Sequence, residues 1–120
     1  MATAEDIIKL SRVIAVVGLS PNPERPSYRV TQYLMRHGFR VVPVNPNIKE
    51  VLGLEAYPDL KSIPFPVDTV DVFRRSEEVL PIVQDAIAIK AKAVWLQEGV
   101  TSDEAEEQAK KAGLLFVMDT

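Results

Sequence analysis

The sequence has 120 residues, 26% charged residues and a formal net charge of −3, as expected for one globular domain that does not bind nucleic acid through a broad positive surface. It has no cysteine and one histidine, which excludes disulfides and thiolate catalysis and leaves no metal site of the usual kind to expect. Neither a membrane-spanning apolar run nor a signal-peptide pattern occurs, so we expect a cytoplasmic protein without a membrane or nucleic acid as partner.

Helical and strand patterns alternate along the chain. A capping box at Thr3 and Asp6 begins the first helix, Ser27 is expected to be the N-cap of the second, and Gly38 its stop. Pro81 requires either a single turn before the third helix or a helix start at that residue. In chain order we predict helix 3–10, strand 13–17, helix 27–37, strand 40–44, strand 69–73, helix 76–90, strand 93–96, helix 103–112 and strand 114–118.

The strands are short, apolar on both faces and separated by helices, which predicts parallel pairing with right-handed crossovers. The fold class is therefore α/β, a Rossmann-like, doubly wound, five-stranded parallel sheet in a single domain over residues 1–120. We expect the strand order 3-2-1-4-5, which places strand 69–73 at an edge and the ligand crevice beyond the C-terminal ends of strands 1 and 4. The loops facing that crevice would be 18–26, 45–49, 74–76 and 97–101.

The segment from Val13 to Arg29 reads as strand, phosphate-sized loop and helix N-terminus, an arrangement suited to anions. Only Gly18 of the three glycines of a dinucleotide fingerprint is present, and Asn45 stands near the end of strand 40–44 instead of an acid. Classical NAD binding is therefore disfavoured. A P-loop is absent, and Val17-Gly18 replaces the paired acids of a phosphoacceptor domain.

Several basic residues lie on the predicted crevice loops. Arg25 and Arg29 flank the helix start and together favour phosphate contact over simple surface solvation. Arg74 and Arg75 follow strand 69–73 and are candidates for a second phosphate contact, with solubility as the alternative. Lys49 is a weaker candidate.

The remaining chemically capable side chains do not form a catalytic set. His37 is expected to be a cation at a helix C-terminus. Asp68 and Asp71 are interpreted as solvated groups of an edge strand, and Trp95 as part of the core. Glu98 lies on a crevice loop across from Gly18, but no second acid or base can be placed at reacting distance from it.

Four segments together resemble a known family: Gly18–Val30, Val44-Asn45-Pro46, Val72–Arg75 and Val94–Val100. They look like the small stand-alone CoA-binding domain proteins, which are similar to the N-terminal domain of the succinyl-CoA synthetase α-subunit. The resemblance covers nearly the whole chain.

The resemblance implies that the Gly18–Ser20 loop and the following helix start hold the phosphates of CoA. The turn after Val44-Asn45-Pro46, with Lys49, would lie near the nucleotide end, and Leu96-Gln97-Glu98 would match the synthetase's Ile-Thr-Glu segment at the CoA site. His37 does not match the synthetase's phosphorylated histidine, which belongs to a second domain. The predicted CoA-binding residues are Gly18, Leu19, Ser20, Arg25, Ser27, Tyr28, Arg29, Asn45, Pro46, Lys49, Phe73, Arg74, Arg75, Leu96, Gln97 and Glu98.

The sequence therefore predicts a protein that binds coenzyme A or an acyl-CoA without catalysis of its own. Three alternatives stay open: a small NAD(P)-type oxidoreductase, a ligase component acting with a partner chain, and an interaction module with a vestigial crevice.

Overall fold

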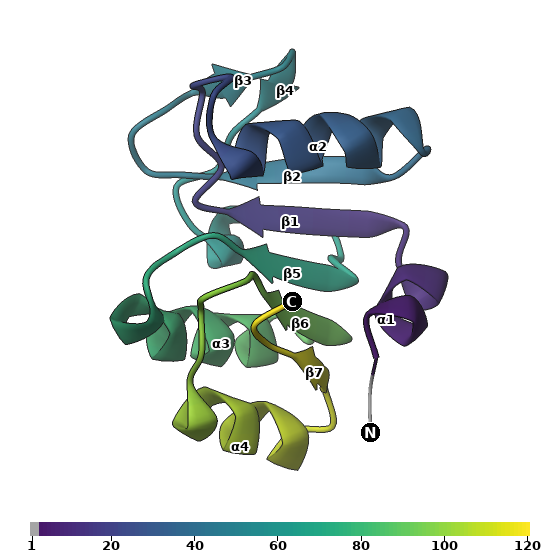
Figure 1. Ribbon diagram of the computed structural model, residues 1–120, viewed down its shortest axis with the longest axis vertical. Helices are drawn as coiled ribbons and strands as arrows, with labels where there is room; N and C mark the ends of the chain where they lie inside the picture. The colour runs from purple at the N-terminus through teal and green to yellow at the C-terminus, as the bar shows by residue number, and fades with distance from the viewer. Residues whose placement is uncertain (1–2) are drawn as a thin grey trace.

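The structure is a computed structural model that describes residues 3–120. Its elements are α1 (Ala4–Leu10), β1 (Val13–Val17), α2 (Pro26–Arg36), β2 (Arg40–Val44), β3 (Glu50–Val51), β4 (Leu54–Glu55), the 3₁₀ turn η1 (Leu60–Ser62), β5 (Thr69–Val72), the 3₁₀ turn η2 (Ser76–Glu78), α3 (Val79–Ala88), β6 (Ala93–Leu96), α4 (Asp103–Lys111) and β7 (Leu115–Val117) (Figure 1). None of the helices described over these residues has the length and apolarity that a membrane crossing requires.

The predicted fold class is confirmed: five parallel strands form one sheet with helices on both faces. Successive residues of β1 face opposite layers. Ile14 and Val16 pack with Leu34 of α2 in one core cluster, whereas Ala15 and Val17 pack in a second cluster that contains buried residues of α3 and α4. This alternation is the two-residue period of a strand buried on both faces.

The predicted strand order was wrong. The observed order is β2-β1-β5-β6-β7, so the strand at Thr69–Val72 lies in the middle of the sheet beside β1 and not at an edge. After β2 the chain runs through a small hairpin, β3–β4, and η1 before it enters β5 on the other side of β1. Apolar patterning reports burial but not which strand is the neighbour, so it did not distinguish the two orders.

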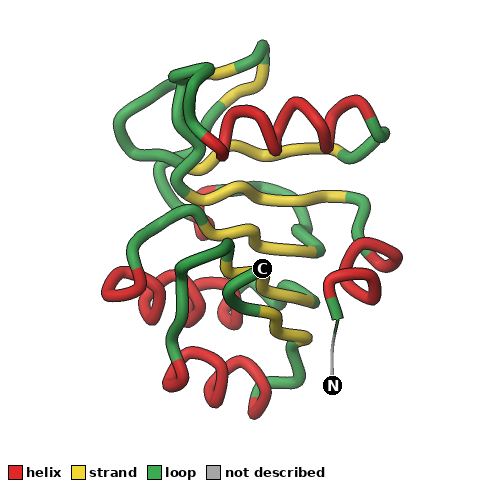
Figure 2. Tube along the Cα trace, viewed as in Figure 1, coloured by secondary structure: helices red, strands yellow, loops and turns green. Residues whose placement is uncertain are grey.

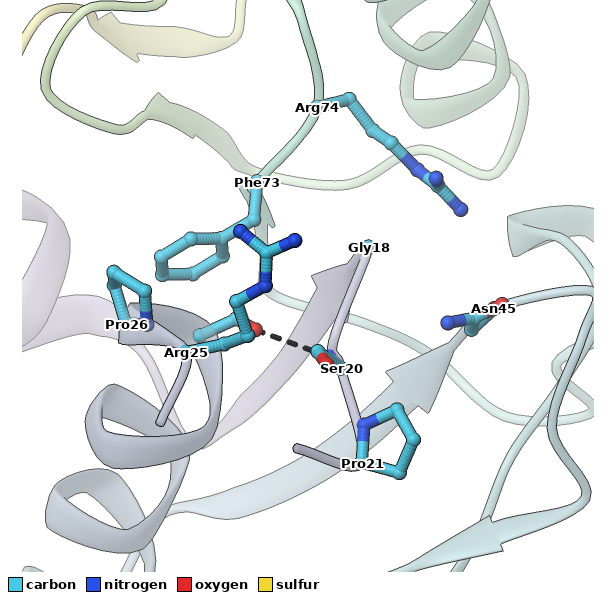
Figure 3. A pocket seen from close by; sticks show the side chains of 9 residues that line it. Gly18, Ser20, Pro21, Arg25, Pro26, Asn45, Phe73 and Arg74 are labelled. Carbon is cyan, nitrogen blue, oxygen red and sulfur yellow. Dashed lines mark hydrogen bonds between the residues drawn. The ribbon is translucent and has the colours of Figure 1, made fainter. Parts of the chain in front are cut away.

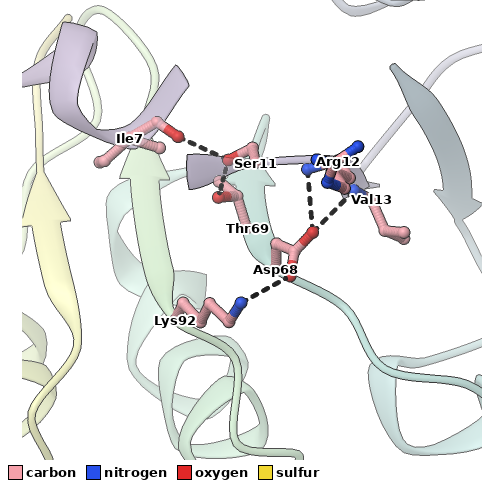
Figure 4. A network of polar contacts seen from close by, with 7 residues as sticks. All are labelled: Ile7, Ser11, Arg12, Val13, Asp68, Thr69 and Lys92. Atoms are coloured by element: carbon pink, nitrogen blue, oxygen red, sulfur yellow. Dashed lines mark hydrogen bonds and ion pairs between the residues drawn. The ribbon is translucent and has the colours of Figure 1, made fainter. Parts of the chain in front are cut away.

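The N-terminal ends of the strands are joined by a side-chain network around Asp68 (Figure 4). Its Oδ2 accepts hydrogen bonds from the backbone N–H groups of Arg12 and Val13, each at 2.9 Å, and its Oδ1 lies 3.4 Å from Nζ of Lys92. Burial by itself raises the pKa of Asp68, but the two N–H donors and Lys92 outweigh it and lower that pKa below its ordinary value. Asp68 thereby connects β1, β5 and the start of β6.

Helix α1 packs beside this network. The predicted capping box of Thr3 and Asp6 is present, Ile7 is fully buried, and the Ser11 hydroxyl contacts both the Ile7 carbonyl and the Thr69 hydroxyl at 2.6 Å. These contacts fix α1 against the end of the sheet opposite the predicted crevice.

The other deviations from prediction are small. The η2 turn precedes α3, and Pro81 lies in the first turn of that helix, where a missing N–H costs nothing. The β3–β4 hairpin was not predicted, because two-residue strands carry too little alternation to detect. Figure 2 shows the loops that leave the C-terminal ends of β1, β2 and β5 gathering at one end of the sheet.

Candidate functional site

A pocket of about 390 Å³ opens at the C-terminal ends of β1, β2 and β5, beside the start of α2 (Figure 3). It lies at the β1–β5 position where the chain reverses direction across the sheet, the usual ligand position in doubly wound folds. The sequence predicted a crevice beyond strands 1 and 4, and the corrected strand order moves it to β1 and β5. Its lining residues are Gly18, Ser20, Pro21, Arg25, Pro26, Ser27, Asn45, Phe73 and Arg74.

Gly18 lines this pocket at a point where the backbone leaves no room for a side chain. Its φ is +88°, and a Cβ at this position would overlap the carbonyl oxygen of Phe73. The Gly18 N–H donates to the Val44 carbonyl at 2.9 Å, while the Phe73 N–H donates to the Val17 carbonyl at 2.8 Å. The ends of three strands therefore converge on a residue without a side chain, and only glycine fits there.

The loop from Ser20 to Arg25 is held by its own side chains. The Ser20 N–H donates to Oγ of Ser27 at 3.0 Å, the Asn22 N–H to Oγ of Ser20 at 3.1 Å, and the Glu24 N–H to Oδ1 of Asn22 at 2.9 Å. These hydrogen bonds satisfy backbone N–H groups of the loop within the chain itself, so the loop keeps its conformation without a ligand.

The prediction that Ser27 caps α2 was wrong. The N-cap is Arg25, whose side chain makes no capping hydrogen bond, and Pro26 is the first helical residue. Proline is favoured at that position because its ring presets the helical φ and it has no N–H to satisfy. Ser27 instead uses its hydroxyl to tether the loop, and the N-terminus of α2 keeps the positive end of its dipole at the pocket.

Asn45 connects the loops that follow β1 and β2. Its Nδ2 donates to the Leu19 carbonyl at 3.0 Å, and its Oδ1 accepts from the Asn47 N–H at 2.9 Å. An asparagine supplies both a donor and an acceptor at this position, which an aspartate cannot do when ionised. The side chain that replaces the ribose-binding acid thus holds two loops together.

The charge of the pocket is positive. Arg25 and Arg74 line it, and neither forms an ion pair with any carboxylate within residues 3–120. No acidic side chain belongs to its lining. Two unpaired guanidinium groups beside a helix N-terminus favour a phosphate-bearing ligand.

The other predicted cations are placed differently. Nη2 of Arg29 donates to the Glu24 carbonyl at 3.3 Å, so this side chain folds back on the loop. Arg75 lies beside Glu78, with Nε 3.7 Å from Oε2, and Lys49 is exposed outside the pocket lining. Arg25 and Arg74 are therefore the pair that the fold brings together at the pocket.

A second hollow of about 450 Å³ adjoins the first. Both are lined by Phe73 and Arg74, and the second extends over η2 to the β6–α4 loop, where it is lined by Glu98, Gly99 and Val100. It also includes Arg75 and Glu78. The two hollows adjoin at Phe73 and Arg74, and we call them together the track; Arg25 lies at its α2 end and Glu98 at its other end.

The remaining predicted site residues lie around this track. The side chains of Leu19 and Leu96 are fully buried. Tyr28 packs partly buried against the α2-side core, and Pro46 lines a separate small cavity. Gln97 donates through Nε2 to Oδ1 of Asp71, away from the track.

Two pocket residues, Pro21 and Pro26, were missed, although their neighbours in the 18–26 loop were predicted. His37 lies at the C-terminal end of α2 as predicted, with Nδ1 2.8 Å from the Tyr33 carbonyl. No cluster of three metal-ligating side chains occurs in the part of the chain that the structure describes.

Comparisons with known proteins show to which family the chain belongs. The model of the CoA binding domain family matches residues 12–120. The chain belongs to this family. It is 39% identical over 118 residues, 98% of the chain and 87% of the relative, to the uncharacterized protein YneT of Bacillus subtilis (strain 168).

Two further proteins are similar to this chain. A hypothetical protein from Pyrococcus horikoshii OT3 superposes with a TM-score of 0.93 at 40% identity, covering 98% of this chain and 85% of the other. An acetate–CoA ligase [ADP-forming] II of Archaeoglobus fulgidus is 27% identical over 99 residues, which span 81% of this chain but 15% of the ligase. The chain is thus homologous to the CoA-binding part of ADP-forming, succinyl-CoA synthetase-like ligases.

Proposed function

We propose that the protein binds coenzyme A or an acyl-CoA along the track described above. The observation that carries this proposal is the pair of unpaired arginines, Arg25 and Arg74, at the N-terminus of α2 in a chain of the CoA binding domain family. Phosphate groups of CoA would occupy the first pocket, contacted by these guanidinium groups and by backbone N–H groups of the loop.

The family resemblance suggests an orientation for the ligand. The turn after Val44-Asn45-Pro46, which includes Lys49, would receive the nucleotide end, as the family resemblance implies. The pantetheine arm would run through the second hollow, past Phe73 toward Glu98. The thiol or acyl end would therefore lie near the β6–α4 loop.

The site is poorly suited to NAD. The residue at the position of the ribose-binding acid is Asn45, and both ends of its amide are engaged in loop contacts. The second and third fingerprint glycines are replaced by Ser20 and Pro23, so the loop lacks the glycine pattern that is typical of dinucleotide binding.

We further propose that the isolated chain catalyses no ligation. A ligation through a phosphoenzyme requires a nucleophile that carries phosphate and a nucleoside triphosphate site. His37, the one histidine of the sequence, lies at the opposite end of α2 from the pocket. Incubation with CoA, ATP, magnesium and short carboxylic acids should yield no thioester by mass spectrometry; thioester above background that Glu98→Gln abolishes would make the protein an enzyme.

The homologous ligase favours a second candidate, a ligase component that acts with a partner chain. In that function the same pocket would present CoA to a catalytic domain on another polypeptide. Thioester formation that appears only when a purified partner is added would support this candidate, and it would leave the CoA site itself unchanged.

The binding proposal is tested by calorimetric titration with CoA. Arg25→Ala should weaken binding by about 1–3 kcal/mol, the scale of a charge-assisted hydrogen bond. Arg36→Ala is the matched control, because it removes the same charge from the last turn of the same helix. Equal losses in both variants would mean that general electrostatics and not this pocket binds CoA.

A further inference from the structure

A separate pocket of about 180 Å³ lies on the α2 side of the sheet, over β5 and β6 and between α1 and α2. It shares no lining residue with the CoA track. Most of its wall is apolar and comes from three elements, with Ile7 and Ile8 from α1, Ile14 from β1 and Val30 and Leu34 from α2. A cavity of roughly 150 Å³ accommodates a benzene ring, so this one has room for a small cyclic molecule.

The carboxyl group of Asp71 lies in the wall of this pocket. The residue is 5% exposed and stands in the central strand, where the sequence predicted a solvated edge. Its Oδ1 accepts a hydrogen bond from Nε2 of Gln97. Within residues 3–120 its Oδ2 has no hydrogen-bond partner and the carboxyl has no ion pair, so this oxygen is left open to the cavity that Asp71 lines.

The surroundings of Asp71 contain no basic residue to neutralise it. Its pKa is raised to about 7, chiefly because burial disfavours the charged form, with the Gln97 hydrogen bond opposing this. Of the side chains that line the cavity from α1, α2, β1, β5 and β6, Tyr33 is the only other titratable group, and His37 stacks on it with ring centroids 4.1 Å apart. A buried carboxylate is stabilised when it is paired or hydrogen-bonded, and a cation that enters the cavity would supply the partner that the chain does not.

Two aromatic side chains add to this preference for a cation. Trp95 and Tyr33 both line the cavity, Trp95 half-buried and Tyr33 56% exposed at the rim. Aromatic faces attract ammonium groups, and the apolar walls favour a hydrocarbon body over a hydrated ion.

We propose that this pocket binds a small organic cation, with its ammonium group on Oδ2 of Asp71 and its apolar ring or short chain between Ile8, Tyr33 and Trp95. The site is independent of the CoA track, because the two share no residue. Binding would pair Asp71 and hold it ionised.

The test uses the fluorescence of Trp95, the one tryptophan of the sequence, during titration with benzylamine at pH 8. The controls are benzyl alcohol and benzoate, which carry a similar ring without a positive charge. We expect a saturable change with benzylamine at an affinity at least about tenfold above that for benzyl alcohol, and none with benzoate. Asp71→Asn should abolish the benzylamine preference, whereas Arg25→Ala should leave it unchanged.

A pH series on the unaltered protein tests the same point without a substitution. Since only ionised Asp71 pairs with the cation, affinity should rise about tenfold from pH 6 to pH 8. Equal affinities for benzylamine and benzyl alcohol, no saturable change, a preference that survives Asp71→Asn, or an affinity independent of pH would each overturn the proposal.

Discussion

The two ends of the parallel sheet use polar groups in opposite ways. At the N-terminal end, Asp68 is matched by two backbone N–H groups and by Lys92. At the C-terminal end, the loop side chains also satisfy one another, but Arg25 and Arg74 remain without a carboxylate partner within residues 3–120. Asp68 is therefore a charge matched within the chain, whereas the pocket at the other end holds two guanidinium groups that have no carboxylate partner within residues 3–120.

The difference shows how this fold separates stability from ligand binding. The chain around β5 contributes to both ends, with Asp68 before the strand and Phe73 and Arg74 after it. The hydrogen bonds within the loop already hold the pocket in shape. Ligand binding should therefore cost little conformational entropy of the chain. Substitution of Asp68 should accordingly change stability and not ligand affinity, and substitution of Arg25 or Arg74 should do the reverse.

The largest effect is expected at Gly18. Gly18→Ala places a side chain against the Phe73 carbonyl at a positive φ, which should lower the free energy of unfolding by about 3–4 kcal/mol in total and remove CoA binding. Gly38→Ala is the control, since its φ is +85° with open space around it, and about 1 kcal/mol is expected. Urea unfolding measures both, and similar losses in the two variants would show that the convergence of strands at Gly18 is unimportant.

The second effect concerns Asp71, which belongs to neither end. Its raised pKa means that the folded protein holds this proton up to about pH 7 whereas the unfolded chain releases it near pH 4. Stability therefore falls as pH rises between these values, and Asp71→Asn should stabilise the protein at pH 8 by an amount on the order of 3 kcal/mol that disappears below pH 4. A gain that is the same at both pH values would contradict the burial of an unpaired carboxyl.

A smaller effect with the opposite sign is expected at Asp68. Its lowered pKa contributes stability that is present above the unfolded value near 4 and is lost as pH falls through the folded value. Asp68→Asn should cost about 2 kcal/mol at pH 7, the scale of a charged hydrogen-bond network, and leave CoA affinity unchanged. Reduced CoA affinity in a folded Asp68→Asn protein would mean that the two ends are coupled.

Local structure was predictable where a single segment decides it. The β-branched runs located the five sheet strands to within about one residue, and Gly18, Arg25 and Arg74 were placed at the crevice from their positions after strands and before a helix. Strand order was not predictable in this way. The apolar pattern of a strand that is buried on both faces does not say which strands are its neighbours in the sheet. The wrong strand order placed Asp71 at an exposed edge of the predicted sheet. The cavity that Asp71 lines between α1 and α2 was therefore not predicted.

The cap of α2 shows a similar limit. Ser27 has the residue type of an N-cap, but Pro26 fixes the helix start two residues earlier than a Ser27 cap would, and the Ser27 hydroxyl is left for the loop. Whether Arg29, Lys49 or Arg75 contacts a ligand depends on side-chain direction, which a sequence pattern does not contain.

The most direct test of the CoA proposal is a thermal-shift comparison of CoA with NAD. At a concentration of about 100 times its Kd, a ligand that binds only the folded state adds roughly 2.7 kcal/mol of stability. For a domain of this size we expect CoA to raise Tm by about 5 °C or more, and NAD to leave it unchanged. Equal shifts with both ligands, or no shift with CoA, would contradict the account.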